Sequence, residues 1–390
     1  MTVEGMFSKL ATERVVFGKP CAEALAAEAE RLGARRVFML VSRTLNTTTD
    51  AVATVRERLA GRFAGEFDGI QPHTPREDCV AAAAAAREAG ADLVVTLGGG
   101  SVTDAGKMVQ ICLEHDVTAT DELERFKTYI EEDGTKHVPE YEGFRVRQVA
   151  IPTTLSGGDF NMRAGCTDSA RKVKESYMHP MMVPRVVILD PAIAVHTPEW
   201  LWLSTGVRAV DHAVETICSQ FSNPYSDGIA MHALRLLSRA LPRCKERPAD
   251  LDARLDCLLG MWASMDHNQA GIPMGCSHGI GHMLGGTAGV PHGHTSCVML
   301  PSVLRYNRTV NAEKQRLVSE AMGRPGEDAA EVLDAFIRGL GMPRSLAEVG
   351  VGRDQFEVIA RNAMHDRHVH TNPRPIKSHE QILEILEMTA

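Results

Sequence analysis

The stretch Asp92-Leu-Val-Val-Thr-Leu-Gly-Gly-Gly-Ser101 decides the fold of this chain of 390 residues. Its first six residues form an apolar run typical of a buried strand, and three glycines separate this run from a segment with helical spacing that extends to Cys112. Such a turn presents free backbone N–H groups at the start of a helix, where a phosphate binds well, although a tight turn alone also favours glycine. The motif therefore predicts a phosphate site at Gly98, Gly99, Gly100, Ser101 and Asp104.

Helix-like and strand-like segments alternate on both sides of this motif. Residues 22–32 and 74–90 have helical composition and end at glycine, whereas residues 37–41 and 146–151 are short apolar runs. Strands that are separated by helices usually pair in parallel, because a crossover helix joins parallel neighbours. We therefore predict a parallel α/β sheet in the first half of the chain.

The second half of the chain has a different character. After Pro191 most segments show helical spacing, and strand-like runs are almost absent. Residues 113–145 are polar with little periodicity, so we expect an excursion over the sheet that covers part of the site. The predicted organisation is an α/β domain over residues 1–190 and an all-α domain over residues 191–390, with the active cleft between them.

A second loop resembles the first in design. Pro152-Thr-Thr-Leu-Ser-Gly-Gly158 follows the strand at 146–151 and adds hydroxyl groups that suit a phosphate or an amide. Two such loops on neighbouring strand ends favour a dinucleotide, with contacts from Thr153, Thr154 and Leu155. Ser42 stands after the first strand, where an acidic residue would favour NAD, so both NADH and NADPH stay open as the cofactor.

Composition excludes several classes of protein. Apolar residues make up 44% of the chain and charged residues 24%, as in an ordinary folded protein. The net charge of −8, without a basic block, argues against binding to nucleic acid or to a membrane surface. Nine scattered cysteines without a Cys-x-x-Cys pair fit reduced thiols, and neither a signal peptide nor a membrane span is evident. We expect a cytoplasmic protein.

Histidines cluster in the second half. Arg208 and His212 stand four residues apart, as do His278 and His282, and four residues apart means one face of a helix. His292 follows after a glycine-rich turn. Imidazoles serve both metal binding and proton transfer, so we predict a shared catalytic site for these residues. Structural roles are expected for His196, His232 and His267.

Five motifs together carry a resemblance that spans nearly the whole chain. They are Gly98-Gly-Gly-Ser101, Pro152-Thr-Thr-Leu-Ser156, Gly206-Val-Arg-Ala-Val-Asp-His-Ala-Val-Glu215, Ser277-His-Gly-Ile-Gly-His-Met-Leu-Gly285 with Pro291-His-Gly293, and Asn372-Pro-Arg374. The chain resembles the iron-containing alcohol dehydrogenase superfamily and, within it, the maleylacetate reductase branch. The resemblance implies a dehydroquinate synthase-like (group III alcohol dehydrogenase) architecture, a nicotinamide dinucleotide between an α/β and a helical domain, and a homodimer.

One position departs from the pattern that this resemblance implies. Metal-dependent members have an Asp at the place of Arg208, and their other ligands correspond to His212, His278 and His292. A guanidinium stays protonated and repels a cation. Three neutral imidazoles could still hold zinc, but the departure favours a site without metal. Maleylacetate reductases usually carry Asn at this place, so the substrate stays open.

The sequence therefore predicts an NAD(P)H-dependent oxidoreductase that reduces a small anionic oxo or enoic acid, as in the reduction of maleylacetate to 3-oxoadipate in aromatic catabolism. His282 or His278 would donate a proton, and Arg208 would stabilise the enolate. Arg163 and Lys174 are candidates for binding substrate carboxylates, although both also fit solvated surface charges.

Three alternatives stay open. The first is an iron- or zinc-dependent alcohol dehydrogenase that acts on a small alcohol or aldehyde. The second is a dinucleotide-binding sensor without turnover, which the many histidines disfavour. The third is a sugar-phosphate cyclising lyase of the same architecture, which would need a metal, and Arg208 argues against it.

Overall fold

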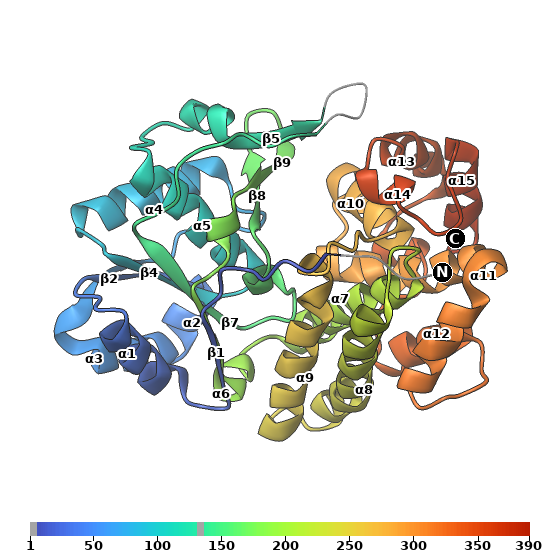
Figure 1. Ribbon diagram of the computed structural model, residues 1–390, viewed down its shortest axis with the longest axis horizontal. Coiled ribbons are helices and arrows are strands. Elements are labelled where there is room, and N and C mark those ends of the chain that lie inside the picture. The colour runs from blue at the N-terminus through green and yellow to red at the C-terminus, as the bar shows by residue number, and fades with distance from the viewer. Residues whose placement is uncertain (1–5, 131–135) are drawn as a thin grey trace. The chain divides into compact units, whose positions relative to one another are not determined.

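The computed structural model describes residues 6–130 and 136–390 (Figure 1). The chain divides into two compact units, which are described separately below. The first unit is Leu10–Thr197, and the second is Pro198–Ala390 together with the described residues up to Lys9. The short helix α6 (Pro191–Ala194) belongs to the first unit. No helix among the described residues is both long and apolar enough to cross a membrane.

A six-stranded parallel sheet forms the centre of the first unit. Its strands, in spatial order, are β1 (Arg14–Phe17), β10 (Val186–Leu189), β7 (Arg147–Pro152), β4 (Leu93–Gly98), β2 (Val37–Val41) and β3 (Phe63–Phe67). Neighbouring strands of this sheet pair in parallel, with Gly98 opposite Pro152 at the ends of β4 and β7. The predicted parallel α/β sheet is therefore confirmed. Because parallel strands end at the same edge, the loops after β2, β4 and β7 are neighbours.

Helices cover both faces of this sheet. On β2, Val37, Met39 and Val41 pack toward α1 (Cys21–Arg31), α2 (Arg43–Thr48) and α3 (Ala51–Leu59). Phe38 and Leu40 point to the opposite face, toward α4 (Arg76–Glu88) and α5 (Gly100–Glu114). Side chains alternate between the faces of a strand, so a wholly apolar strand is buried on both sides.

The polar segment 113–145 contains more structure than its sequence indicates. It holds the end of α5, a 3-10 turn η2 (Asp121–Phe126) and strands β5 (Lys127–Ile130) and β6 (Lys136–His137). These strands join β9 (Val173–Met178) and β8 (Arg163–Asp168) in a four-stranded sheet. Leu123, Phe126 and Phe144 are buried against α4 and α5, so much of the segment is part of the core. Its residues 131–135 lie outside the described residues.

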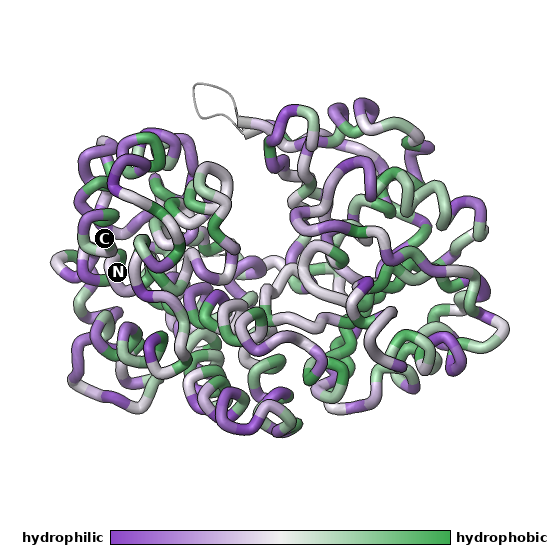
Figure 2. Tube along the Cα trace, turned by 180° about the vertical axis from the view of Figure 1, so that it is seen from behind, coloured by the Kyte–Doolittle hydropathy of each residue, from purple (hydrophilic) through white to green (hydrophobic). Residues whose placement is uncertain are grey.

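The second unit is helical, and residues 198–390 contain no strand. Hydrophilic and hydrophobic stretches alternate along its helices, as amphipathic helices require (Figure 2). Its helices are α7 (Glu199–Cys218), α8 (Pro224–Glu246), α9 (Leu251–Ser264), α10 (Cys276–Ala288), α11 (His292–Ala321), α12 (Ala329–Gly339), α13 (Phe356–Ala363), α14 (Arg367–His370) and α15 (His379–Glu387). Helix α7 is buried from Trp202 to Cys218, so its polar side chains must find partners inside the unit.

Candidate active site

The first unit presents a glycine edge, defined here as Ser42, Gly98–Ser101 and Thr153–Leu155. The backbone N–H of Ser42 donates to Leu97 O at 2.9 Å, and that of Thr153 donates to Gly98 O at 3.0 Å. These two bonds tie the loops after β2 and β7 to the end of β4. The structure thus brings together the three segments that the sequence assigns to the cofactor, and their contacts with it stay a prediction.

Close packing explains why this edge needs glycine. A Cβ added to Gly98 would lie 2.9 Å from Val102 Cγ2, and one added to Gly99 would lie 3.1 Å from Thr154 Cγ2. The φ of Gly99 is −84°, so space and not backbone strain excludes a side chain. The N–H groups of Val102 and Thr103 donate to Gly99 O at 3.0 and 3.1 Å, and those of Gly100 and Ser101 precede them at the helix start, where an anion can bind. The edge fits the pyrophosphate of a dinucleotide.

Two predicted cofactor contacts have structural partners. Asp104 Oδ2 accepts the backbone N–H of Gly165 at 3.1 Å, which links α5 to β8. Leu155 is fully buried, and its contact with the cofactor stays a prediction. No sequence motif singled out Lys107, whose buried Nζ donates to Gly158 O at 2.7 Å and to Arg163 O at 2.6 Å. Lys107 therefore fixes the chain that follows the second loop.

The proposed carboxylate binders lie in the four-stranded sheet of the first unit. Arg163 begins β8, and its backbone N–H donates to Asn161 Oδ1 at 2.9 Å. Lys174 lies on β9 opposite Thr167 and is exposed. The histidines of the predicted catalytic site belong to the second unit. A role for Arg163 and Lys174 in substrate binding stays a prediction.

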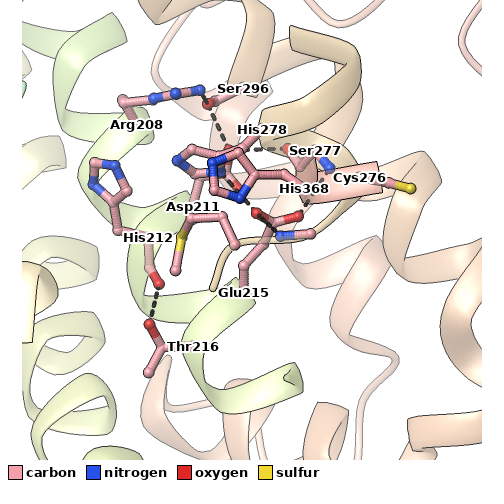
Figure 3. A network of polar contacts seen from close by, with 12 residues as sticks. Arg208, Asp211, His212, Glu215, Thr216, Cys276, Ser277, His278, Ser296 and His368 are labelled. Atoms are coloured by element: carbon pink, nitrogen blue, oxygen red, sulfur yellow. Dashed lines mark hydrogen bonds and ion pairs between the residues drawn. The ribbon is translucent and has the colours of Figure 1, made fainter. Parts of the chain in front are cut away.

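The second unit contains a histidine cluster that α7, the 3-10 turn η5 (Met265–Asn268), α10, α11 and the segment around α14 build together, and Figure 3 shows part of it. Its members are Arg208, Asp211, His212, Glu215, His267, His278, His282, His292, Ser296, Asp366 and His368. On α7 the polar residues at 208, 211, 212 and 215 recur every three or four positions, so they lie on one side of the helix. The structure thus gathers the histidines that the sequence groups.

A buried carboxylate holds the start of α10. Glu215 accepts the backbone N–H of Gly275 at 2.9 Å and of Ser277 at 2.8 Å, and it contacts His278 Nδ1 at 2.7 Å. Helix α10 has no side-chain cap of its own, so Glu215 supplies the missing acceptors from α7. Burial raises the pKa of Glu215 to about 8 and holds the pKa of His278 well below its usual value.

Arg208 is buried, and among the described residues no carboxylate lies within ion-pair distance of its guanidinium. Its Nη1 donates to Ser296 Oγ at 3.1 Å, and Ser296 donates to Asp211 Oδ2 at 2.6 Å. Ser277 donates to the same oxygen at 2.9 Å. Within the described chain, no carboxylate oxygen lies within 4.0 Å of the Arg208 nitrogens. Burial lowers the pKa of Arg208, and the charges of Asp211, Glu215 and Asp366 oppose this shift.

The remaining imidazoles lie close to one another. The ring of His212 is 4.8 Å from that of His278 and 5.6 Å from that of His267. Burial lowers the pKa of His212 well below its usual value and that of His267 to about 4, so both are neutral near pH 7. His267 also contacts Ile272 O at 3.2 Å. His267 therefore packs against the predicted catalytic histidines, although its sequence context indicated only a structural role.

Sequence patterns did not identify the other members of the histidine cluster. Glu215, Ser296, Asp366 and His368 contact the predicted histidines or Arg208 across 63 to 88 positions of chain. Single Glu, Ser or Asp residues carry no pattern that marks such long-range contacts. The only local signal was the Glu215 position, four residues after Asp211 on the same helix.

The residues that correspond to the metal ligands of the family do not form one ligand group among the described residues. Within the described ranges, two groups in the second unit bring three possible ligand atoms within 4.8 Å of one another, namely Asp211–Glu215–His278 and His282–Asp366–His368. Neither contains His212 or His292. Arg208 stands at the place of the fourth ligand, where its fixed charge opposes a cation. We therefore derive no chemistry from a metal.

Comparison with known proteins agrees with this organisation. The model of the iron-containing alcohol dehydrogenase family matches residues 12–191, and the model of its C-terminal part matches residues 202–390. A dehydrogenase of Gibberella moniliformis is 33% identical, with 96% of each chain covered. Maleylacetate reductase 1 of Cupriavidus pinatubonensis is 31% identical, with 94% of this chain and 92% of that protein covered.

A solved structure shows the same fold. The crystal structure of maleylacetate reductase from Agrobacterium tumefaciens matches with a TM-score of 0.83 at 29% identity, and the match covers 100% of this chain and 98% of that one. The chain belongs to the iron-containing alcohol dehydrogenase family. It is an NAD(P)H-dependent oxidoreductase of the maleylacetate reductase-like branch, which confirms the predicted resemblance.

Proposed function

We propose that the protein reduces a small anionic oxo or enoic acid without a metal ion, as in the conversion of maleylacetate to 3-oxoadipate during aromatic catabolism. The observation that carries the proposal is the buried guanidinium of Arg208, which contacts a neutral hydroxyl and no carboxylate. A buried cation of this kind attracts an anion. The similarity to maleylacetate reductases adds support.

The side chains divide the chemistry among them. A bound nicotinamide would supply hydride, and reduction at the conjugated double bond would leave the charge of an enolate on the substrate. Arg208 would stabilise that charge by hydrogen bonding. His282, whose side chain is 35% exposed, is the better proton donor, because burial holds the pKa of His278 well below its usual value and His278 therefore carries no second proton near pH 7.

The remaining assignments belong to the same proposal. Cofactor binding is assigned to residues 1–190, with Ser42 tolerating NADPH as well as NADH, and catalysis to residues 191–390. Arg163 and Lys174 are kept as candidate contacts to substrate carboxylates. The protein would act in the cytoplasm without nucleic-acid or membrane partners, as its charge and composition indicate, and as a homodimer, as the resemblance to the family implies.

A metal-dependent alcohol dehydrogenase that acts on a small alcohol or aldehyde is the second candidate. One observation favours it, since His212 Nδ1 and His278 Nε2 are buried without a hydrogen-bond partner in the described chain. Buried polar atoms normally have partners, and both residues correspond to ligands in metal-dependent members. The charge of Arg208 weighs against this candidate.

Metal analysis of the purified enzyme separates the two candidates. Iron and zinc would be measured alongside NADH and NADPH oxidation with maleylacetate and with simple aldehydes, before and after a chelator. We expect metal well below one ion per chain, chelator-resistant activity and preference for maleylacetate. Stoichiometric metal, with activity lost on its removal, would establish the second candidate instead.

A further inference from the structure

Helix α10 carries two histidines one turn apart, and each of them contacts a carboxylate through Nδ1. His278 contacts Glu215, and these side chains are 4% and 7% exposed. His282 contacts Asp366 at 2.8 Å, and these side chains are 35% and 12% exposed. The two pairs share one design, but only the second has an imidazole that solvent or a substrate can reach. The sequence and the family motifs assign no role to Asp366.

The carboxylate of Asp366 is held from both sides. Its Oδ2 contacts His282 Nδ1 at 2.8 Å, and its Oδ1 accepts the backbone N–H of His368 at 2.8 Å. Burial raises the pKa of Asp366, but the hydrogen bond to His282 outweighs it, so the pKa is lowered. An ionised carboxylate only accepts hydrogen bonds. The hydrogen of this contact therefore belongs to Nδ1 of His282.

The neighbours of His282 fix its ring. The ring of His292 stacks on it at 5.9 Å between centroids and 3° between planes. Gly279 lets the Asp366 segment approach α10, because a Cβ there would lie 2.7 Å from Val369 Cγ2 and 3.4 Å from Asp366 Oδ1. With Nδ1 engaged and the plane set, Nε2 is the nitrogen left for chemistry.

We propose that Asp366 is a positioning residue that keeps a hydrogen on Nδ1 of His282 and leaves Nε2 to exchange a proton with the substrate oxygen. In the step, the N–H bond at Nε2 breaks, its electron pair stays on nitrogen, and an O–H bond forms on the enolate oxygen. The proton comes from His282 in its doubly protonated form, which keeps its Nδ1–H bond to Asp366 throughout. The inference rests on the proposed role of His282 as proton donor.

Histidine tautomers give a test that needs no substrate. In protein with ¹⁵N-labelled histidine, comparison with His282→Gln identifies the His282 signals. We expect the wild type to carry hydrogen on Nδ1 and Asp366→Ala to lose this preference, whereas Asp366→Asn, which keeps an acceptor oxygen, retains part of it. An unchanged tautomer in Asp366→Ala would overturn the proposal. Because this readout is independent of turnover, it stands apart from the identity of the substrate.

Kinetics then separate positioning from a merely structural role. With whichever carbonyl substrate the wild type reduces, Asp366→Ala should lower kcat by about 10–100-fold, the range for losing the partner that orients a reactive imidazole, and leave KM and NADH affinity within about twofold. Adding Asp366→Ala to His282→Gln should cause no further loss. Asp354→Ala, at an exposed acidic residue, is the control.

Each kinetic result either supports or contradicts the positioning role of Asp366. Additive losses in the double variant, or a normal kcat in Asp366→Ala, would contradict the positioning role. If Asp366→Ala does not fold, Asp366→Asn takes its place, with a smaller loss of kcat expected and an unchanged kcat contradicting the proposal. Failure of the wild type to reduce maleylacetate would overturn the proposed substrate and leave the Asp366 tests valid with an aldehyde.

Discussion

The glycine edge of the first unit and the histidine cluster of the second are built in opposite ways. The glycine edge offers backbone N–H groups in a place where a Cβ at Gly98 or Gly99 would meet a neighbour at 2.9 or 3.1 Å. The histidine cluster consists of side chains, most of them buried, that come from separate elements of the second unit. A site made of backbone depends on space, whereas a site made of charged side chains depends on partners.

This difference predicts separate failures. Substitutions at the glycine edge should weaken cofactor binding and leave the chemistry of the bound state intact. Substitutions in the histidine cluster should change folding stability or turnover and leave cofactor affinity intact. The following variants test that separation, in order of decreasing effect.

The largest effect is expected from Glu215→Ala, which removes the acceptor for the N–H groups of Gly275 and Ser277 and for His278. Each buried N–H group left without its acceptor costs about 1–3 kcal/mol, and the variant leaves at least two of them. Urea unfolding should therefore show a lower free energy of unfolding. Glu313→Ala, whose side chain is 92% exposed, should change it by less than about 0.5 kcal/mol. Equal stability of the two variants would contradict the role of Glu215 as a distant helix cap.

A smaller effect, on cofactor affinity, is expected from Gly99→Val. The new side chain would press on Thr154 and occupy the phosphate position, and losing two charge-assisted bonds costs about 3 kcal/mol, or roughly 100-fold in affinity. Fluorescence titration with NADH measures it. Gly61→Val, at a glycine with nothing within 4 Å of an added Cβ, is the control. Unchanged affinity in Gly99→Val would show that the phosphate lies elsewhere.

The smallest of the three effects is expected from Ser296→Ala. The variant removes the hydroxyl that accepts from Arg208 and donates to Asp211. A hydrogen bond to a charged group contributes about 1.5–3 kcal/mol, so kcat/KM should fall at least about tenfold with NADH affinity unchanged. Ser302→Ala, at another buried serine of α11, serves for comparison. A loss of NADH affinity in Ser296→Ala would break the separation of the two sites.

The sequence predicted the glycine edge better than the histidine cluster for the same physical reason. A strand, a glycine turn and a helix are contiguous, so Asp92 to Ser101 already contains their pattern, and apolar runs such as 37–41 mark buried strands. Only the spacing of His278 and His282 indicated helix α10, because its glycines and missing side-chain cap obscure where it begins. Its cap is Glu215, which lies 60 positions from Gly275.

The helical motifs identified candidate catalytic histidines but not the residues that contact them. Spacing placed His278 and His282 on one face of a helix, but nothing local showed that Glu215 seals the first and Asp366 orients the second. The same limit applies to His267, which looked isolated and stacks on His212 at 5.6 Å. Segment 113–145 is a different case, because its polar composition did not indicate a core, yet its few apolar residues Leu123 and Phe126 are buried.

The most direct test of the central claim compares two substrates in the wild type and in Arg208→Ala. Losing an oriented charged partner costs about 2–4 kcal/mol, or roughly 30–1000-fold in rate. We predict a loss of that size in kcat/KM for maleylacetate, little change for a neutral aldehyde, and partial recovery in Arg208→Lys. Full activity of Arg208→Ala on maleylacetate, or equal losses on both substrates, would contradict the assignment of Arg208 to an anionic substrate.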